Sequence, residues 1–168
     1  MPSEIVLRCS EALKNREMCL AFAESATAGR MAFEFSLCPQ SGSILKGGLV
    51  CYDASVKTDV LGLDPELIEK FTPESAEVTQ AMAHRLQYLI PSDIQVAVTG
   101  LTTPGGSENK EKPVGTMFLH IILKHRSIAQ KVAFHGSPEE MVLQTIDLLA
   151  YTILQALETN VPHSTLES

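Results

Sequence analysis

Short apolar runs alternate with helix-like segments along this chain, and their pattern limits the folds that it can adopt. Residues 19–23 form an apolar run without polar–apolar alternation, and further apolar runs lie at residues 49–52 and 94–98. A run of the first kind is typical of a strand that is buried on both faces. A sheet is buried in this way when helices cover both of its sides, so the pattern predicts an α/β fold, a three-layer α/β/α sandwich.

Helix signals fall between these runs. Ser3 can cap a first helix, whose apolar residues, among them Cys9 and Leu13, recur at helical spacing. We expect short helices over residues 30–35 and around Lys57. These segments supply part of the two layers that cover the sheet.

The longest clear helix is expected before the third apolar run. We place its start at Thr72-Pro73-Glu74, a cap with proline at the first helical position, and its end at Pro91. Its predicted buried stripe consists of Ala76, Thr79, Met82, Ala83, Leu86, Leu89 and Ile90.

The last third of the chain predicts a hairpin and a final helix. Residues 116–123 and 128–134 indicate two strands that turn near His125, which makes the sheet mixed. Ser137-Pro138-Glu139-Glu140 is a capping box with proline in its second place. The helix that it starts is expected to run to about Leu157.

The composition agrees with one compact domain inside the cell. The chain has 168 residues, of which 45% are hydrophobic, so it can bury a core without disulfides. We expect a single domain over residues 1–160 and a frayed tail over residues 161–168. No apolar run approaches the roughly 18 residues of a membrane span, and the start lacks the pattern of a secretory signal. A cytoplasmic protein without membrane contact is therefore expected.

Charge and cysteine spacing argue against two further classes of site. The net charge of -7 disfavours a nucleic-acid surface, which requires clustered lysine and arginine. The short basic cluster at residues 124–126 is interpreted as a hairpin tip. The four cysteines form no C-x-x-C pair, so we expect buried reduced thiols and no metal site.

Three junctions combine residues that are useful for chemistry. In open α/β sheets, ligands bind at the carboxyl ends of the strands. The junctions at residues 24–29, 47–57 and 99–106 lie at such ends, and each combines glycine with hydroxyl or amine side chains. Acyl transfer needs a nucleophile, a base and aimed backbone N–H donors, so these junctions indicate a site of that kind.

Ser25 is the candidate nucleophile, because it lies before a predicted helix whose free N–H groups would stabilise an oxyanion. None of the five histidines belongs to the three junctions, so Lys57 is the candidate base in a Ser–Lys arrangement. Such a lysine must be partly neutral, which requires that burial or a nearby positive charge lowers its pKa. Tyr52 would relay the proton or orient the lysine.

Each of these residues also has a plainer interpretation. A serine before a helix is commonly a cap, and a lysine is commonly a solvated charge. Tyr52 would then pack with its hydroxyl in water, Glu24 would be a helix-terminus charge, and residues 104–106 would form only a turn. Residue types and spacing alone predict an α/β domain with a hydroxyl-based site.

Taken together, several ordered motifs resemble the CinA C-terminal domain family, which includes the nicotinamide-nucleotide amidases. The family turn E-S-C-T-G-G corresponds to Glu24-Ser25-Ala26-Thr27-Ala28-Gly29, and the segment G-G-x-V-x-Y-x4-K corresponds to residues 47–57. The helix motif V-S-x-E-x-A-x-x-M-A resembles residues 72–83. The loop T-G-I-A-G-P-x-G resembles residues 99–106, and P-V-G-T occurs at residues 113–116.

The resemblance implies a CinA C-terminal domain-like fold and an activity. The reaction would be deamidation of nicotinamide mononucleotide to nicotinic acid mononucleotide, with release of ammonia. Ser25 would be the nucleophile, Lys57 the base and Tyr52 the supporting tyrosine. The substrate would be bound by the matching turns and loops, at Glu24, Thr27, Gly29, Gly48, Thr99, Gly100, Gly105 and Gly106.

The resemblance also implies partners and organisation. The partner would be a small-molecule nucleotide substrate, and neither a metal nor an organic cofactor is needed. We expect a homo-oligomer without nucleic-acid or membrane contacts. The chain lacks the larger N-terminal domain of full-length CinA proteins, so a stand-alone version is expected.

Some positions depart from the family pattern. Ala26 replaces a cysteine, Ala28 replaces a glycine, and residues 102–103 replace Ala-Gly. The last helix of the family begins with a motif like G-D-R-x-x-I-R, but residues 136–142 hold no arginine. Loss of a cation that is aimed at an oxyanion would raise the activation free energy by about 3 kcal/mol, unless Arg30 takes its place. The alternative function is therefore a catalytically degenerate nucleotide-binding or scaffolding protein.

Overall fold

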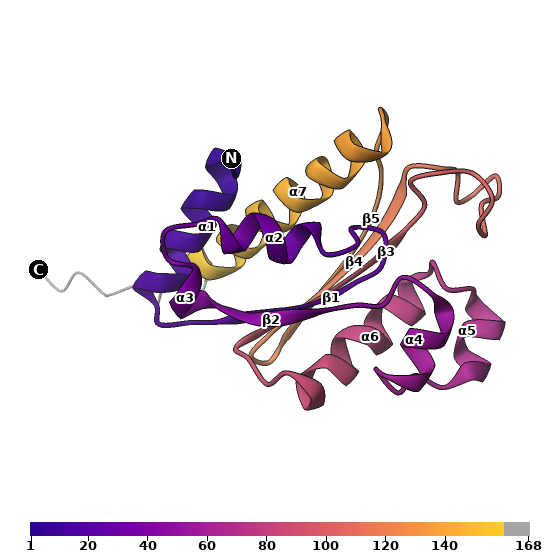
Figure 1. Ribbon diagram of the computed structural model, residues 1–168, viewed down its shortest axis with the longest axis horizontal. Helices are drawn as coiled ribbons and strands as arrows, with labels where there is room; N and C mark the ends of the chain where they lie inside the picture. The colour runs from indigo at the N-terminus through magenta and orange to yellow at the C-terminus, as the bar shows by residue number, and fades with distance from the viewer. Residues whose placement is uncertain (160–168) are drawn as a thin grey trace, which may run out of the picture.

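Five strands form one sheet between two layers of helices (Figure 1). The computed structural model describes residues 1–159. The strands are β1 (Leu20–Glu24), β2 (Leu45–Val50), β3 (Ile94–Gly100), β4 (Thr116–Leu123) and β5 (Arg126–Ala133). One face carries α1 (Glu4–Asn15), α2 (Arg30–Ser36), α3 (Ser41–Ile44) and α7 (Pro138–Glu158). The other face carries α4 (Ala54–Asp59), α5 (Pro65–Phe71) and α6 (Ala76–Leu89), so the predicted three-layer α/β/α sandwich is confirmed.

The sheet is mixed, as the hairpin predicts. Its strands lie in the order β2-β1-β3-β4-β5. Strand β1 is parallel to β2 and β3, whereas β4 is antiparallel to β3 and β5. Glu24, at the end of β1, pairs with Val50 of β2 and with Val98 of β3. The carboxyl ends of three strands therefore meet at one edge of the sheet.

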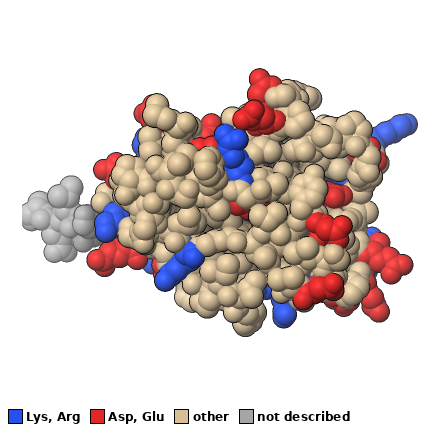
Figure 2. Space-filling model, viewed as in Figure 1, with Lys and Arg blue, Asp and Glu red and all other residues tan. Residues whose placement is uncertain are grey.

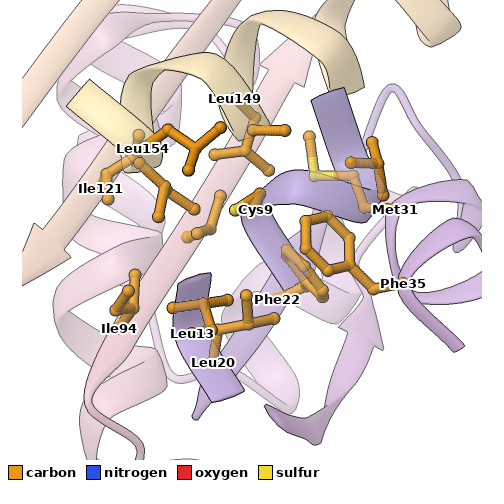
Figure 3. Packing of buried hydrophobic residues seen from close by; sticks show 14 of the residues in the cluster. Cys9, Leu13, Leu20, Phe22, Met31, Phe35, Ile94, Ile121, Leu149 and Leu154 are labelled. Atoms are coloured by element: carbon orange, nitrogen blue, oxygen red, sulfur yellow. The ribbon is translucent and has the colours of Figure 1, made fainter. Parts of the chain in front are cut away.

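Alternate side chains of β1 enter two separate cores. Leu20 and Phe22 face α1, α2 and α7, and the ring centroids of Phe22 and Phe35 lie 5.3 Å apart (Figure 3). Ala21 and Ala23 face the opposite side and pack in the core with α6. All residues of β1 are buried, because both faces of the strand are covered.

The start predicted for the helix before β3 is wrong. Helix α6 begins at Ala76 and is capped by Ser75, whose hydroxyl accepts a hydrogen bond from the Val78 N–H at 3.2 Å. Thr72 ends the preceding helix with a φ of 70°, a conformation that cannot cap a following helix. The cap-and-proline signature belongs instead to Asp64-Pro65, which starts the unpredicted helix α5.

The buried stripe of α6 also differs from the prediction. Thr79, Met82, Ala83 and Leu86 are buried, but the set is completed by Val78. Ala76 and Leu89, the first and last residues of the helix, are exposed, and Ile90, which follows the helix, is half-buried against the core. Short helix α3 and the first residues of β2, from Leu45, were not predicted either.

The C-terminal prediction is confirmed within the described residues. The hairpin turns at residues 124–125, and Ser137 and Glu140 form both hydrogen bonds of the capping box. Helix α7, with 21 residues, is longer than α6, with 14. None of the helices in residues 1–159 has the length and apolar character to cross a membrane. The predicted domain boundary at residue 160 and the tail over residues 161–168 lie outside the described residues.

Removal of the Phe22 ring tests the main core. We expect Phe22→Ala to lower the free energy of unfolding by about 3–5 kcal/mol, because the fully buried ring leaves a cavity beside Phe35. Phe33→Ala is the matched control, since Phe33 is 54% exposed, and its effect is expected to stay below about 1 kcal/mol. Urea unfolding followed by circular dichroism measures both values; equal effects would contradict the assignment of the core.

Candidate active site

The three junctions predicted to carry chemistry come together beside one cavity. Ser25 follows β1, Lys57 lies on α4 after β2, and residues 100–106 continue from the end of β3. The cavity has a volume of about 230 Å³. Its walls are formed by residues 100–106, here named the glycine-rich loop, together with Ser25, Ala26, Tyr52 and Glu74.

Ser25 and Lys57 are in direct contact. The Nζ atom of Lys57 lies 3.0 Å from the Oγ atom of Ser25. The lysine side chain is only 1% exposed, and its Nζ also donates to the carbonyl oxygens of Cys51 at 2.6 Å and Tyr52 at 3.4 Å. The described residues offer Ser25 Oγ no other hydrogen-bond partner. The nucleophile and base candidates, which are far apart in the sequence, thus meet in space.

The surroundings of Lys57 favour a neutral amine. A neutral amine has two N–H groups and a lone pair, whereas an ammonium has three N–H groups. In the structure, Lys57 Nζ donates to the Ser25 hydroxyl and to the two carbonyl oxygens. Loss of one proton would leave two N–H groups for the two carbonyls and a lone pair that faces Ser25 Oγ. Burial lowers the pKa of Lys57 below its ordinary value, although the nearby Cys51, Glu74 and Asp53 oppose this in part.

The short helix α4 aims Lys57 inward. Asp53 caps the helix and accepts hydrogen bonds from the Ser55 N–H at 2.8 Å and the Ser55 hydroxyl at 2.6 Å. This cap fixes the start of the helix, and Lys57 is its one fully buried residue. The carbonyl of Lys57 accepts from the Leu63 N–H at 2.9 Å, which folds the following segment back over the helix. Contacts of residues before and after Lys57 in the sequence therefore fix the position of its backbone.

The carboxylate of Glu24 holds the turn that carries Ser25. It accepts hydrogen bonds from the Thr27 hydroxyl at 2.7 Å and from the N–H groups of Gly29 and Met31, both at 3.0 Å, and Ala32 at 2.9 Å. A carboxylate is favoured at this place, because the free N–H groups and the helix dipole of α2 are positive there. Glu24, Thr27 and Gly29 were predicted to bind substrate; the structure places them in this turn, with Glu24 and Thr27 buried, and outside the cavity wall.

The N–H groups that would stabilise an oxyanion are therefore not those expected. The start of α2 is occupied by Glu24, and the N–H of Ser25 donates to the Val98 carbonyl at 3.0 Å. The N–H groups of Ala26 and Thr27 have no acceptor among the described residues, and Ala26 lines the cavity. The N–H of Ala26 directly follows the nucleophile at the cavity wall, so it is the candidate oxyanion donor.

Ala28 occupies a left-handed turn position. Its φ is 48°, and that of Gly29 is 93°. An alanine in this region is strained by about 1–2 kcal/mol relative to the glycine of the family pattern. The turn keeps its shape despite this residue, because the carboxylate of Glu24 bonds residues on both sides of it.

The remaining predicted residues divide into two groups. Gly100, Gly105 and Gly106, which were predicted to bind the substrate, line the cavity. Thr99 does not, because its buried hydroxyl bonds the hydroxyl of Thr79 at 2.8 Å behind the cavity wall. Gly48 is also outside the wall; a Cβ atom at this position would lie 3.4 Å from Phe22, so the glycine serves close packing of β2.

Tyr52 lies at the mouth of the cavity. Its side chain is 64% exposed, and within residues 1–159 its hydroxyl bonds neither Ser25 nor Lys57. The carbonyl of Tyr52, not its hydroxyl, contacts the lysine. In the structure, the Tyr52 hydroxyl therefore has no contact with Lys57 through which it could relay a proton or orient the amine.

Arg30 cannot replace the arginine that the family pattern places at the last helix. Its guanidinium bonds the carboxylate of Glu34 at 2.6 Å and that of Glu139 at 3.2 Å. Arg30 does not line the cavity, and the start of α7 is occupied by its own capping box.

A polar cluster around the buried Lys112, beside the cavity, was missed by the sequence analysis. The Nζ of Lys112 donates to the Thr72 hydroxyl at 2.8 Å, the Glu74 carbonyl at 2.7 Å and the Ser107 hydroxyl at 2.6 Å. The Ser107 hydroxyl in turn donates to the Glu74 carboxylate. The cluster ties the segment after the glycine-rich loop to the segment before α6. No pattern in the sequence distinguishes Lys112 from the neighbouring solvated charges.

No histidine is among the described residues that line this cavity. In the part of the chain that the structure describes, no three His, Cys, Asp or Glu side chains are grouped so that they could hold a metal ion. His120 lies on β4, where its Nε2 contacts the Ser127 hydroxyl at 2.7 Å and its ring faces His84. Burial lowers the pKa of His120, and this histidine does not line the cavity.

Comparison with known proteins assigns the whole described chain to one family. The sequence model of the family described as "CinA C-terminal domain" matches residues 3–157. A CinA-like protein of Desulfotalea psychrophila is 36% identical over 149 residues, which cover 86% of this chain and 36% of that protein. The chain thus spans about a third of the length of the curated relatives that it matches.

Solved structures agree with the fold. The competence damage-inducible protein A of Klebsiella pneumoniae superposes with a TM-score of 0.88 over 94% of this chain and 98% of that chain, at 23% identity. A competence/damage inducible protein of Agrobacterium tumefaciens gives a TM-score of 0.84 over 94% and 98% of the two chains, at 25% identity.

Loss of the Glu24 charge tests the turn that presents Ser25. We expect Glu24→Ala to lower the free energy of unfolding by at least about 2 kcal/mol, because it leaves buried N–H donors of α2 without an acceptor. Thr27→Val removes a single hydrogen bond to the same carboxylate and should cost about 1 kcal/mol. Urea unfolding distinguishes these values; a Glu24→Ala protein as stable as the parent would contradict the structural role.

Proposed function

The chain belongs to the CinA C-terminal domain family, and on that basis we propose that it is an amidohydrolase acting through Ser25 and Lys57. The proposed reaction converts nicotinamide mononucleotide to nicotinic acid mononucleotide and ammonia. The observation that carries the proposal is the 3.0 Å contact between Lys57 Nζ and Ser25 Oγ at the cavity. The choice of substrate rests on the resemblance of the motifs.

In the first half of the reaction, Ser25 becomes acylated. Lys57 accepts the hydroxyl proton of Ser25, and the Oγ atom attacks the carboxamide carbon. The carbonyl oxygen becomes an oxyanion, which the N–H group of Ala26 stabilises. The ammonium of Lys57 then gives its proton to the departing nitrogen, so that ammonia leaves and an ester with Ser25 remains.

In the second half, water hydrolyses the ester with Ser25. Lys57, again neutral, accepts a proton from the attacking water, and a second oxyanion forms at the N–H of Ala26. Collapse of this intermediate breaks the ester bond. Lys57 returns the proton to Ser25, and the carboxylic acid product leaves. The chain supplies both the nucleophile and the base, so the proposed reaction needs neither a metal nor an organic cofactor.

The other cavity residues have proposed binding roles. Tyr52 stands at the mouth, where its exposed ring can stack on the aromatic ring of the substrate. Gly100, Gly105 and Gly106 allow the substrate to approach the backbone of the glycine-rich loop. The four cysteines are free thiols, which supports the cytoplasm as the proposed compartment.

A second candidate function is binding without turnover. The observation that favours it is the ion pairing of Arg30 with Glu34 and Glu139, which leaves the family's arginine without a replacement at the cavity. Such a protein would bind the nucleotide and release no ammonia. The two candidates therefore differ in one measurable product.

Replacement of the reacting pair tests the enzymatic proposal. Ser25→Ala and Lys57→Met are each expected to lower ammonia release from nicotinamide mononucleotide by about a thousandfold or more, because each removes a partner of the same proton transfer. The matched control is Lys70→Met, an exposed lysine on α5, which is expected to keep the parent rate. Equal rates from the parent protein and Ser25→Ala would refute this mechanism.

The pH dependence follows from the state of Lys57. Because only the neutral amine accepts a proton, kcat/KM is expected to rise with pH and to reach half its maximum below 10.5, the ordinary pKa of lysine. The carboxylate of Glu74 raises this pKa, so Glu74→Gln is expected to move the rise to lower pH. A profile that falls as the pH increases would exclude Lys57 as the base.

A further inference from the structure

The connection between β3 and β4, residues 101–115, forms most of the cavity wall. Seven of the eleven described residues that line the cavity belong to the glycine-rich loop, which makes up the first part of this connection. The connection stands out from the sheet at the end of the molecule that carries α4 and α5 (Figure 1). Figure 2 shows acidic and basic side chains projecting together at this end. The shape of the cavity therefore depends on what holds this exposed segment in place.

The backbone fastens the connection at its base alone. The Leu101 N–H donates to the Thr116 carbonyl at 3.0 Å, and the Gly115 N–H donates to the Leu101 carbonyl at 2.6 Å. Beyond this base, the described backbone hydrogen bonds of residues 102–114 stay within residues 109–116. Side chains must therefore hold the outer part of the connection against the rest of the domain.

Lys112 is the one buried residue in this outer part. It is 7% exposed, whereas every other residue of 102–114 is exposed or half-buried. Burial of an ammonium is unfavourable unless hydrogen bonds satisfy it. The three N–H groups of Lys112 meet three oxygens at 2.6–2.8 Å: the hydroxyls of Thr72 and Ser107 and the carbonyl of Glu74. The lysine thus takes the place that an apolar anchor has in other loops.

The contacts of Lys112 join the connection to the segment before α6. A further contact with the connection comes from the exposed Lys131, which donates to the Glu111 carbonyl at 3.1 Å. A second cavity, of about 370 Å³, adjoins the cluster and is lined by Lys112 and Glu74. Glu74 lines the active-site cavity as well, so hollows flank the cluster on two sides. Few other contacts can replace those of Lys112.

One partner of Lys112 has an unfavourable backbone conformation. Thr72 has a φ of 70° and a ψ of 155°, values that a β-branched residue rarely adopts. Such a conformation persists where the surrounding contacts enforce it. The Thr72 hydroxyl accepts the bond from Lys112 and donates to the Glu74 carbonyl at 3.4 Å. Lys112 therefore also stabilises the segment that brings Glu74 into the cavity wall.

From these observations we infer that Lys112 is a positioning residue of the proposed active site, because it fastens the β3–β4 connection beside the cavity as a lid. The inference rests on the proposed amidase function. Lys112 does not line the cavity, so it acts through the glycine-rich loop and Glu74.

The reacting pair does not depend on this lid. The described hydrogen bonds of Ser25 and Lys57 involve no residue of the connection. Release of the lid would therefore weaken the binding of the substrate and leave the proton transfer intact. The wall contacts the substrate in the bound state and in the transition state alike, and loss of such uniform binding raises KM with little change in kcat.

Limited proteolysis measures how often the lid opens. Glutamyl endopeptidase can cleave after the exposed Glu108 and Glu111 when the connection leaves the domain. We expect Lys112→Met to speed these two cleavages by at least about tenfold. Lys110→Met is the matched control, because it removes the same charge from an exposed position of the same connection. Parent cleavage rates in Lys112→Met, or equal acceleration in Lys110→Met, would overturn the inference.

Kinetic constants separate a lid from a general loss of stability. For nicotinamide mononucleotide, Lys112→Met is expected to raise KM by at least about tenfold and to keep kcat within about threefold of the parent value. A substitution that only reduces the amount of folded protein lowers the apparent kcat and leaves KM unchanged. An unchanged KM in Lys112→Met would therefore contradict the positioning role.

A second variant tests the same contact from its other side. Thr72→Val removes one acceptor of Lys112 and keeps a β-branched residue at the strained position. It is expected to speed the two cleavages and to raise KM by about threefold, so the test does not depend on the folding of Lys112→Met. In the double variant, KM should match that of Lys112→Met alone, because both changes act through one contact. Effects that multiply would contradict this shared contact.

The outcomes distinguish the lid from the proposed function. If the parent protein released no ammonia, the amidase would be refuted, and the Kd of nicotinamide mononucleotide from calorimetric titration would replace KM. A Kd that rises at least about tenfold in Lys112→Met would still support the lid. If the parent protein neither bound nor hydrolysed the nucleotide, the cleavage comparison alone would decide the inference. Ammonia release with parent KM and parent cleavage rates in Lys112→Met would refute the lid and leave the amidase intact.

Discussion

A buried amine with few oxygen neighbours is the interaction on which this site depends. Lys57 is nearly inaccessible to solvent, and its Nζ meets two carbonyl oxygens and the hydroxyl of Ser25. Burial penalises the ammonium and lowers the pKa of Lys57, and loss of one proton would leave two N–H groups for the two carbonyls. The lone pair of the neutral amine would then face the hydroxyl of Ser25. The reactivity proposed for Ser25 follows from this arrangement without any histidine.

The sheet explains why such a contact forms between residues so far apart in sequence. Strand β1 lies between two parallel neighbours, so the segments that leave β1, β2 and β3 emerge at one edge. Glu24 then uses the positive start of α2 to fix the turn after β1, which holds Ser25 in place. The same edge carries the glycine-rich loop, and Glu74 closes the wall from the segment before α6. The parallel arrangement of β1, β2 and β3 thus places the turn after β1, the glycine-rich loop and the cavity at the same edge of the sheet.

Much of the fold and of the candidate site could be predicted from the sequence, and the predictions that failed did so for physical reasons. The unbroken apolar run of β1 and the capping box of Ser137 are local signals, and both were confirmed. The meeting of Ser25 and Lys57 was predicted from the strand ends at which both lie. In contrast, the cap at Ser75 was missed because Pro73 offered a stronger local signal for an earlier start. The roles of Glu24 and Glu74 depend on where a side chain points, which spacing does not encode.

The central claim is that the Lys57 amine is neutral when it faces Ser25, and its titration measures this most directly. The side chains of the lysines can be followed by NMR through their Cε resonances over a range of pH, with Lys57→Arg to assign the signal. The account predicts that Lys57 titrates below 10.5, the ordinary pKa of lysine, and below the exposed lysines of the same protein. A Lys57 signal that titrates at or above the exposed lysines would contradict it.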